Sequence, residues 1–122
     1  MPAVTIYHNP HCTKSRQTLR LLESKGVKPE IVFYLQNPPD AQTLKTIVKM
    51  LGVKPVDLIR KTEKLYTTLG LDKKVDDEAL IQAMVQHPIL IERPIVIHGN
   101  QAAIGRPPNK VLGVLKKPEE PE

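Results

Sequence analysis

The sequence predicts an α/β fold in which a β-α-β unit and a later β-hairpin with its own helix are separated by a helical insertion. Three observations support this class. Residues 3–35 change from a strand pattern to a helix pattern and back. Residues 40–87 contain only helix patterns, and residues 94–115 contain two short apolar runs around a glycine turn, followed by an amphipathic stretch. We expect a single domain over residues 1–115.

The β-α-β unit is predicted at the start of the chain. Residues 3–7, AVTIY, are rich in β-branched residues, as strands are, and the turn HNPHC follows them. Leucines separated by polar residues predict a helix over about residues 13–24, and Gly26 ends it. Residues 30–35, EIVFYL, form the second predicted strand. Such a unit gives two parallel strands with a right-handed crossover.

Three helices are predicted in the insertion. Each has a start signal at an N-cap aspartate or a proline, and the outer two have a stop signal at a glycine or a proline. The first runs from Asp40 to Gly52, with Leu44, Ile47, Val48 and Leu51 on one face. The second is the stretch VDLIRKTEKLY, which follows Pro55. The third runs from Asp76 to His87-Pro88, and its apolar residues are Ala79, Leu80, Ala83 and Met84.

A β-hairpin and a helix are predicted near the end. PIVI and AAI are its strands, Gly99-Asn100 is the turn, and a helix begins at Pro107 with Val111, Leu112 and Leu115 as its stripe. The tail 116–122 is charged and rich in proline, so we expect it to be disordered. Without the insertion, this element order is that of thioredoxin. The sequence therefore predicts a thioredoxin-like fold with a helical insertion between the second strand and the C-terminal β-hairpin.

The composition argues against several classes of protein. No apolar run approaches 18 residues and no secretion signal precedes the first strand, so we expect neither a membrane span nor export. The net charge is +5, but the lysines are scattered and aromatic residues make up only 3%, which does not favour nucleic-acid binding. One cysteine excludes an internal disulfide and a multi-cysteine zinc site. We expect a cytoplasmic protein without a bound metal or cofactor.

Cys12 is the leading candidate for a catalytic residue. It follows a predicted strand and a tight turn, and it stands just ahead of a helix. Unpaired N–H groups and the positive end of the helix dipole stabilise a thiolate at such a position. The alternative is a buried structural cysteine, because free cysteines are often buried. We favour the nucleophile, because a loop before a helix is a poor place to bury an inert thiol.

His8 and Ser15 flank this cysteine. His8 stands four residues before Cys12 across the turn and could lower the thiol pKa, although a strand-end histidine bonded to the backbone is the ordinary alternative. Ser15 stands where a second cysteine would make a dithiol pair, and its hydroxyl can donate to a thiolate, so we expect it among the substrate-binding residues. A serine in the first turn of a helix is also simply common. His11 is adjacent to Cys12, and no metal-site pattern surrounds the remaining histidines.

Three arginines complete the candidate site. Arg93 precedes a proline at the start of a strand, the position where thioredoxin-like folds carry a cis proline beside the active cysteine. Arg60 and Arg106 are the other arginines outside the first helix. Taken singly, each of these arginines is most simply interpreted as a solvated surface residue. Together with a nucleophilic thiol they suggest a cradle for an oxyanion.

The motifs around these residues resemble the glutaredoxin-coupled arsenate reductase family. The matching stretches are YHNPHCTKSRQTL, NPP, LIRK, LIQAMVQHPILIERPIVI and IGRPP, in order over roughly residues 3 to 115. HNPxCxxSR and HPILIxRPIV are specific motifs. Thr13-Lys14 departs from the smaller or uncharged residues of the plasmid-type enzymes, and the shorter chain resembles the chromosomal branch of the family.

This resemblance implies an activity and a set of roles. Cys12 would be the nucleophile, His8 would help to activate it, and Arg60, Arg93 and Arg106 would hold arsenate. Glutathione and glutaredoxin would supply the second thiol, and arsenite would leave. Two alternatives stay open. One is a regulator like the related Spx proteins, which bind RNA polymerase, although Ser15 removes the Cys-x-x-Cys switch that many of them carry. The other is a thiol reductase for another oxyanion or for glutathionylated protein.

Overall fold

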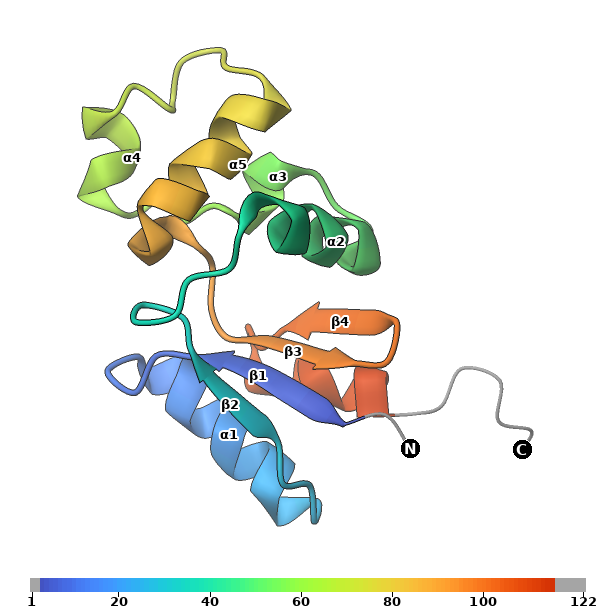
Figure 1. Cartoon of the computed structure of the whole chain (residues 1–122). Coiled ribbons are helices and arrows are strands. Elements are labelled where there is room, and N and C mark those ends of the chain that lie inside the picture. Colours follow the sequence, from blue (N-terminus) through green and yellow to red (C-terminus); the bar gives the residue numbers. More distant parts are fainter. Residues whose placement is uncertain (1–2, 116–122) are drawn as a thin grey trace. The chain divides into compact units, whose positions relative to one another are not determined.

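A computed structural model of the chain describes residues 3–115 (Figure 1). The chain divides into two compact units. The first unit combines Met1–Phe33 with Arg93–Glu122, and the second unit is Tyr34–Glu92. The second unit is the helical insertion that the sequence predicts. The tail predicted to be disordered, residues 116–122, lies outside the described residues.

The first unit is built on a four-stranded sheet of order β2-β1-β3-β4. Strands β1 and β2 are parallel, with Ile6 opposite Ile31. Strand β3 runs antiparallel to both β1 and β4, which places Val96 between Ile6 and Ala103. The elements of this unit are β1 (Val4–His8), α1 (Thr13–Ser24), β2 (Glu30–Phe33), β3 (Ile95–His98), β4 (Gln101–Ile104) and the 3-10 segment η2 (Pro108–Leu115).

The connections of the first unit agree with the predictions. Helix α1 joins the parallel strands β1 and β2, as expected of a β-α-β unit. The hairpin between β3 and β4 turns at Gly99, where φ is +64°, a conformation that glycine adopts without steric penalty. The peptide bonds that precede Pro94 and Pro107 are both cis.

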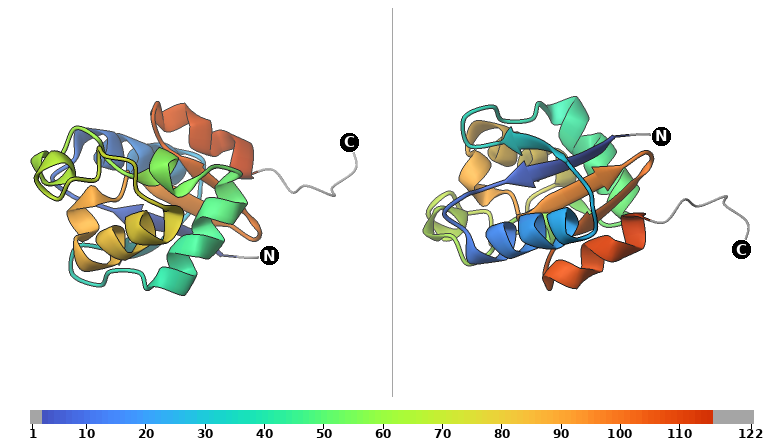
Figure 2. Two further views of the ribbon diagram at one scale, coloured as in Figure 1. Left: turned by 90° about the horizontal axis from the view of Figure 1, so that it is seen from above. Right: turned by 90° about the horizontal axis from the view of Figure 1, so that it is seen from below.

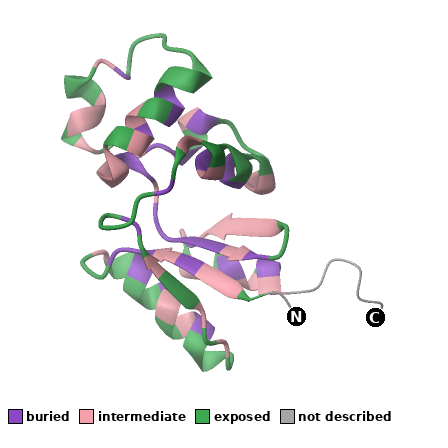
Figure 3. Ribbon diagram, in the orientation of Figure 1, coloured by how far each residue is buried: buried purple, intermediate pink, exposed green. Residues whose placement is uncertain are grey.

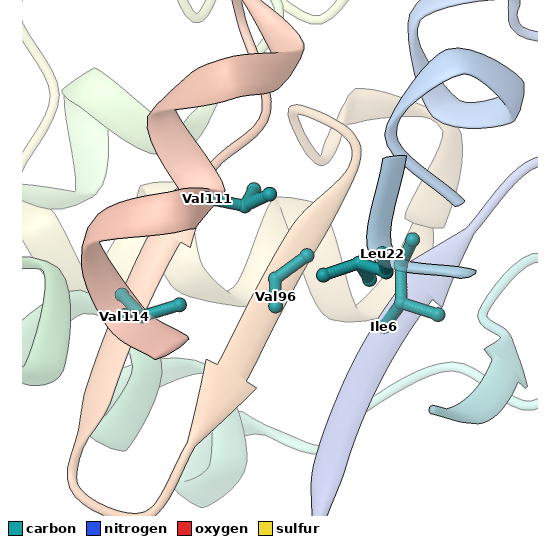
Figure 4. Packing of buried hydrophobic residues seen from close by; sticks show 5 residues of the cluster. All are labelled: Ile6, Leu22, Val96, Val111 and Val114. Atoms are coloured by element: carbon teal, nitrogen blue, oxygen red, sulfur yellow. The ribbon is translucent and has the colours of Figure 1, made fainter. Parts of the chain in front are cut away.

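The core of the first unit lies between one face of the sheet and two helical elements. Helix α1 and segment η2 pack side by side on this face (Figure 2). Five buried side chains meet there, contributed by β1, α1, β3 and η2 (Figure 4). They are Ile6, Leu22, Val96, Val111 and Val114. A further link fastens η2 to the sheet, because the ring Nδ1 of His98 lies 2.7 Å from the carbonyl oxygen of Val114.

The second unit contains helices alone among its regular elements. They are α2 (Ala41–Leu51), α3 (Pro55–Leu58), α4 (Lys64–Thr68), α5 (Asp77–Gln86) and the 3-10 turn η1 (Pro88–Leu90). The predicted caps are present: the Asp40 carboxylate accepts the Thr43 N–H at 2.8 Å, and Gly52 ends α2 with φ +69°. Asp76 caps α5 in the same way. Buried positions recur along α2 and α5, with exposed positions between them (Figure 3).

The prediction of one continuous helix after Pro55 is wrong. The structure has the single turn α3, an extended residue at Ile59, and the separate helix α4. Ile59 forms a β-bridge with Ile91, and the Arg60 N–H donates to the Leu90 carbonyl at 2.7 Å. This pairing with a distant part of the chain takes the backbone groups that a continuous helix would use.

Two predicted apolar stripes also need correction. In α5 the buried residues are Leu80, Ile81 and Met84, whereas Ala79 is exposed. The last helix begins at Pro108 and is a 3-10 segment, whose buried side chains Val111 and Val114 stand three residues apart. That spacing fits the period of three of a 3-10 helix, in which residues i and i+3 share a face.

Within residues 3–115, we find no helix with both the length and the apolar character needed to cross a membrane.

The burial of the core side chains predicts how substitutions change the free energy of unfolding. Leu22 is fully buried, so Leu22→Ala removes apolar contacts and leaves a cavity, and we expect it to lower the free energy of unfolding by about 2–5 kcal/mol. Leu69→Ala is the matched control, because the same side chain is 43% exposed there, and its effect is expected to stay below about 1 kcal/mol. Urea denaturation measures both. Equal losses for the two variants would contradict the assigned core.

Candidate active site

Cys12 occupies the N-cap position of α1, directly after the turn that leaves β1. Its own backbone is extended, with φ −99° and ψ 122°, and the residue is half-buried. Asn9 shapes the turn: its carbonyl accepts the Cys12 N–H at 3.0 Å, and its side-chain oxygen accepts the His11 N–H at 3.0 Å. The thiol is therefore held at a defined point above the first turn of the helix, where backbone N–H groups have no partner within the helix.

Ser15 links the turn, the strand and the helix. Its side chain is fully buried, and its hydroxyl accepts the Asn9 N–H at 3.1 Å. The same hydroxyl lies 2.6 Å from Nδ1 of His8 at the end of β1. The backbone N–H of Ser15 donates to the Cys12 sulfur. The sequence expectation placed the hydroxyl at the thiolate, but the structure gives that task to the backbone N–H and engages the hydroxyl with His8 and Asn9.

Two guanidinium groups reach Cys12 from the far end of the sequence. Arg106 donates from Nη2 to the sulfur at 3.4 Å, and its Nε donates to the Arg93 carbonyl at 2.7 Å. Arg93 is 92% buried and also donates to the sulfur through its side chain. These residues stand before β3 and after β4, so the hairpin carries both cations to the N-terminus of α1. The structure thus brings Arg93 and Arg106 together at Cys12.

The pKa of the Cys12 thiol lies below its ordinary value. Partial burial raises this pKa, because a thiolate loses hydration when it is covered. The Ser15 N–H, the Arg93 side chain and the positive charge of Arg106 lower it, and together they outweigh burial. A lowered pKa increases the thiolate fraction near pH 7, which is the nucleophilic form.

The His8 ring contacts the turn at Cys12 through its hydrogen bond with Ser15. Burial lowers the pKa of its ring, and the nearby Arg16 lowers it further, so the imidazole is neutral near pH 7. The ring packs edge-on against Phe33, with 5.9 Å between ring centroids. A neutral ring adds no positive potential beside Cys12, and its connection to the thiol runs through Ser15.

Arg60 belongs to the second unit. Its Nη1 lies 2.9 Å from Glu92 Oε1, and its Nε lies 3.5 Å from Glu63 Oε2. The guanidinium is therefore engaged with two carboxylates in its own unit. That Arg60 joins Cys12 in one site stays a prediction. Of the other histidines, His98 binds the Val114 carbonyl and His87 caps the end of α5.

The described part of the chain offers no group of three or more His, Cys, Asp or Glu side chains suited to hold a metal ion.

The contribution of Asn9 was not predicted from the sequence, where it stood only as one residue of the turn HNPHC. A signal was present, because asparagine side chains commonly accept the backbone N–H two residues ahead in a turn. Here that geometry fixes the residue before Cys12.

A thioredoxin-like fold with a half-buried thiol between two guanidinium groups defines a class of thiol protein. Comparison with known proteins identifies the family. The ArsC family model matches residues 7–114, and the chain belongs to this family.

Three relatives illustrate the similarity. The chain is 53% identical over 114 residues to the protein YfgD of Escherichia coli K12, covering 92% of this chain and 96% of that protein. It is 49% identical over 115 residues to an arsenate reductase of Haemophilus influenzae, covering 93% and 99%. The solved structure of an arsenate reductase from Vibrio cholerae matches with a TM-score of 0.89 at 46% identity, over 93% of this chain and 98% of that one.

The contacts at the sulfur predict how its pKa responds to substitution. Arg106→Met removes a cation that favours the thiolate, so we expect the pKa of Cys12 to rise and alkylation near pH 7 to slow. The pH dependence of the alkylation rate by iodoacetamide measures this change.

Arg16→Met is the matched control for this measurement. Arg16 is exposed, and its guanidinium donates to the Pro10 carbonyl and the Thr13 hydroxyl. Its removal is expected to raise the pKa of His8, seen by NMR titration, and to change the pKa of Cys12 less than Arg106→Met does. Equal rises of the Cys12 pKa in the two variants would contradict the geometry described above.

Proposed function

We propose that this chain is an arsenate reductase that forms an adduct on Cys12 and completes the reaction with glutathione and glutaredoxin. The observation that carries the proposal is the pair of guanidinium donors, Arg93 and Arg106, on one activated sulfur. A thiolate and an oxyanion repel each other, and two cations at their meeting point offset that repulsion. Relatives that are 41–49% identical and carry the name arsenate reductase support this substrate.

The chemistry begins with nucleophilic attack. Cys12 attacks arsenic, forms an S–As bond, and one oxygen of the oxyanion leaves as hydroxide or water. The guanidinium groups of Arg93 and Arg106 donate to the oxygens that gain charge during attack. Their planar, forked donors suit a tetrahedral oxyanion better than the single ammonium of lysine.

The second half of the reaction needs a thiol from outside the chain. Reduction of arsenate to arsenite takes two electrons, which two thiols supply when they join as a disulfide. The chain has one cysteine. Glutathione then attacks arsenic and displaces a second oxygen as water. Glutaredoxin attacks the glutathione sulfur, and the bond from that sulfur to arsenic breaks with its electron pair left on arsenic. Water then cleaves the remaining bond to Cys12, so that arsenic leaves as arsenic(III). Over the full cycle two thiol sulfurs become one disulfide, and one oxygen of arsenate ends in water.

The external thiol provides the decisive test. The reduced protein with arsenate alone is expected to give no catalytic turnover, and addition of glutathione, glutaredoxin and an NADPH-dependent recycling system starts it. Cys12→Ser is expected to abolish turnover, because a neutral hydroxyl is a far weaker nucleophile and cannot take part in the redox step. The measurement is the oxidation of NADPH together with the arsenite formed.

Two outcomes of that assay would refute the proposal. One is steady turnover with thioredoxin as the sole thiol source, and the other is full activity of Cys12→Ser. Wild-type protein that reduces another oxyanion under these conditions, but not arsenate, would keep the thiol chemistry and reject the substrate.

Arg60 provides a separate prediction. We propose that Arg60 also binds the oxyanion. Arg60→Gln is then expected to remove about 2–4 kcal/mol of transition-state stabilisation, which lowers kcat/KM for arsenate correspondingly. Lys61→Gln, which removes an exposed neighbouring cation, is the control and is expected to leave kcat/KM nearly unchanged. Because Arg60 also pairs with Glu92 and Glu63, urea denaturation of both variants separates lost binding from lost stability. Equal kcat/KM values in the two variants would exclude Arg60 from the site.

A further inference from the structure

Gly105 is a buried residue between β4 and Arg106, and it lies against helix α1. A Cβ added to Gly105 would overlap the Thr18 hydroxyl oxygen, and it would stand 3.1 Å from Thr18 Cγ2 and 2.9 Å from Pro94 Cγ. The backbone of Gly105 does not adopt positive φ. This position therefore requires glycine because of the close approach of Thr18 and Pro94, and not because of its backbone conformation.

Thr18 is the partner in this contact. Its side chain is fully buried, and its hydroxyl donates to the Lys14 carbonyl one turn earlier at 2.8 Å. The Gly105 carbonyl oxygen lies 3.5 Å from the same hydroxyl. Gly105 is held from its other side as well, because its N–H donates to the Pro94 carbonyl at 2.9 Å. Thr18 thus presses against a segment of chain that has little room to move.

The same segment carries Arg106 to the sulfur. Arg106 follows Gly105 directly, and the Arg106 guanidinium is fastened at the Arg93 carbonyl and at Cys12. Helix α1 carries Cys12 at its N-cap and Thr18 in its second turn. The helix and the chain segment therefore touch at two points, Cys12 with Arg106 and Thr18 with Gly105. A rigid helix transmits a shift at one contact to the other.

We propose that Thr18 and Gly105 are positioning residues, whose close approach sets how near the Arg106 guanidinium lies to the Cys12 sulfur. The effect on the thiol follows from the structure alone. The effect on arsenate rests on the proposed function, because there the guanidinium also has to meet the oxyanion.

The thiol is the most direct readout of this contact. The charged and titratable groups that bear on Cys12 come from three places: Arg93 and Arg106 from the hairpin, His8 through Ser15 from β1, and Arg16 near His8 from α1. A shift of Arg106 leaves the Ser15 N–H at the sulfur. A displaced Arg106 therefore raises the pKa of Cys12 by less than the loss of all the donors would. The alkylation rate at high pH, where the thiol is ionised in any case, stays unchanged.

Gly105→Ala tests the proposal. The added methyl group pushes the segment away from Thr18, so we expect the pKa of Cys12 to rise by roughly half a unit, which slows alkylation at pH values below that pKa by roughly threefold. In the arsenate assay we expect KM to rise more than kcat falls. Gly113→Ala is the matched control: Gly113 is exposed in η2, and a Cβ there meets nothing within 4 Å. This control is expected to keep the wild-type alkylation profile.

The double variant Thr18→Ala with Gly105→Ala tests whether the two residues act through each other. Removing the Thr18 side chain takes away two of the three close atoms, so the double variant is expected to recover most of the wild-type pKa. Thr18→Ser keeps the hydroxyl and is expected to stay close to wild type.

The results that overturn the proposal are specific. A folded Gly105→Ala with an unchanged alkylation profile overturns it, and so does a double variant whose pKa change equals the sum of the single changes. If Gly105→Ala does not fold, Thr18→Ala alone tests the proposal. We expect this variant to slow the alkylation of Cys12 near pH 7 by roughly twofold. An unchanged alkylation rate would overturn the proposal. Alkylation needs no arsenate, so a wild-type protein that fails to reduce arsenate would reject the proposed function without affecting this result.

Discussion

The set of donors that lowers the pKa of the Cys12 thiol is the constraint around which the first unit is arranged. A half-buried thiol becomes harder to ionise, and only donors fixed in place reverse that tendency. One donor is the backbone of α1, and the others are two arginines carried by a hairpin that stands more than eighty residues later in the chain. The sheet β2-β1-β3-β4 is what brings these segments together, since β1 leads into the cysteine and β3 lies beside it.

Local signals in the sequence were enough to predict most of this arrangement. The bounds of α1, the caps at Asp40 and Gly52, and the turn at Gly99 follow from residue types that favour one backbone geometry. The break after α3 could not be predicted in this way. It depends on Ile59 pairing with Ile91, a contact between distant residues that leaves no trace in the residues around position 59.

In the candidate site too, some features were predictable from the sequence and others depended on the folded structure. Cys12 and the arginines were identified from motifs, and the structure places Arg93 and Arg106 on the sulfur. The detailed roles of His8 and Ser15 were not predictable, because they depend on burial. A histidine in water carries partial charge near neutral pH, whereas the covered ring of His8 is neutral and binds a hydroxyl instead.

The burial of Ser15 also bears on how such a protein can evolve. A second cysteine at this position would let the chain form its own disulfide with Cys12, which an outside reductant would then have to reopen, and it is one nucleotide change away for some serine codons. Yet sulfur is larger than oxygen and a weaker acceptor, so the Asn9 N–H and the His8 ring would both lose a buried partner. The mutational path to a two-cysteine site therefore passes through a damaged turn beside Cys12, which favours lineages that keep a single cysteine there.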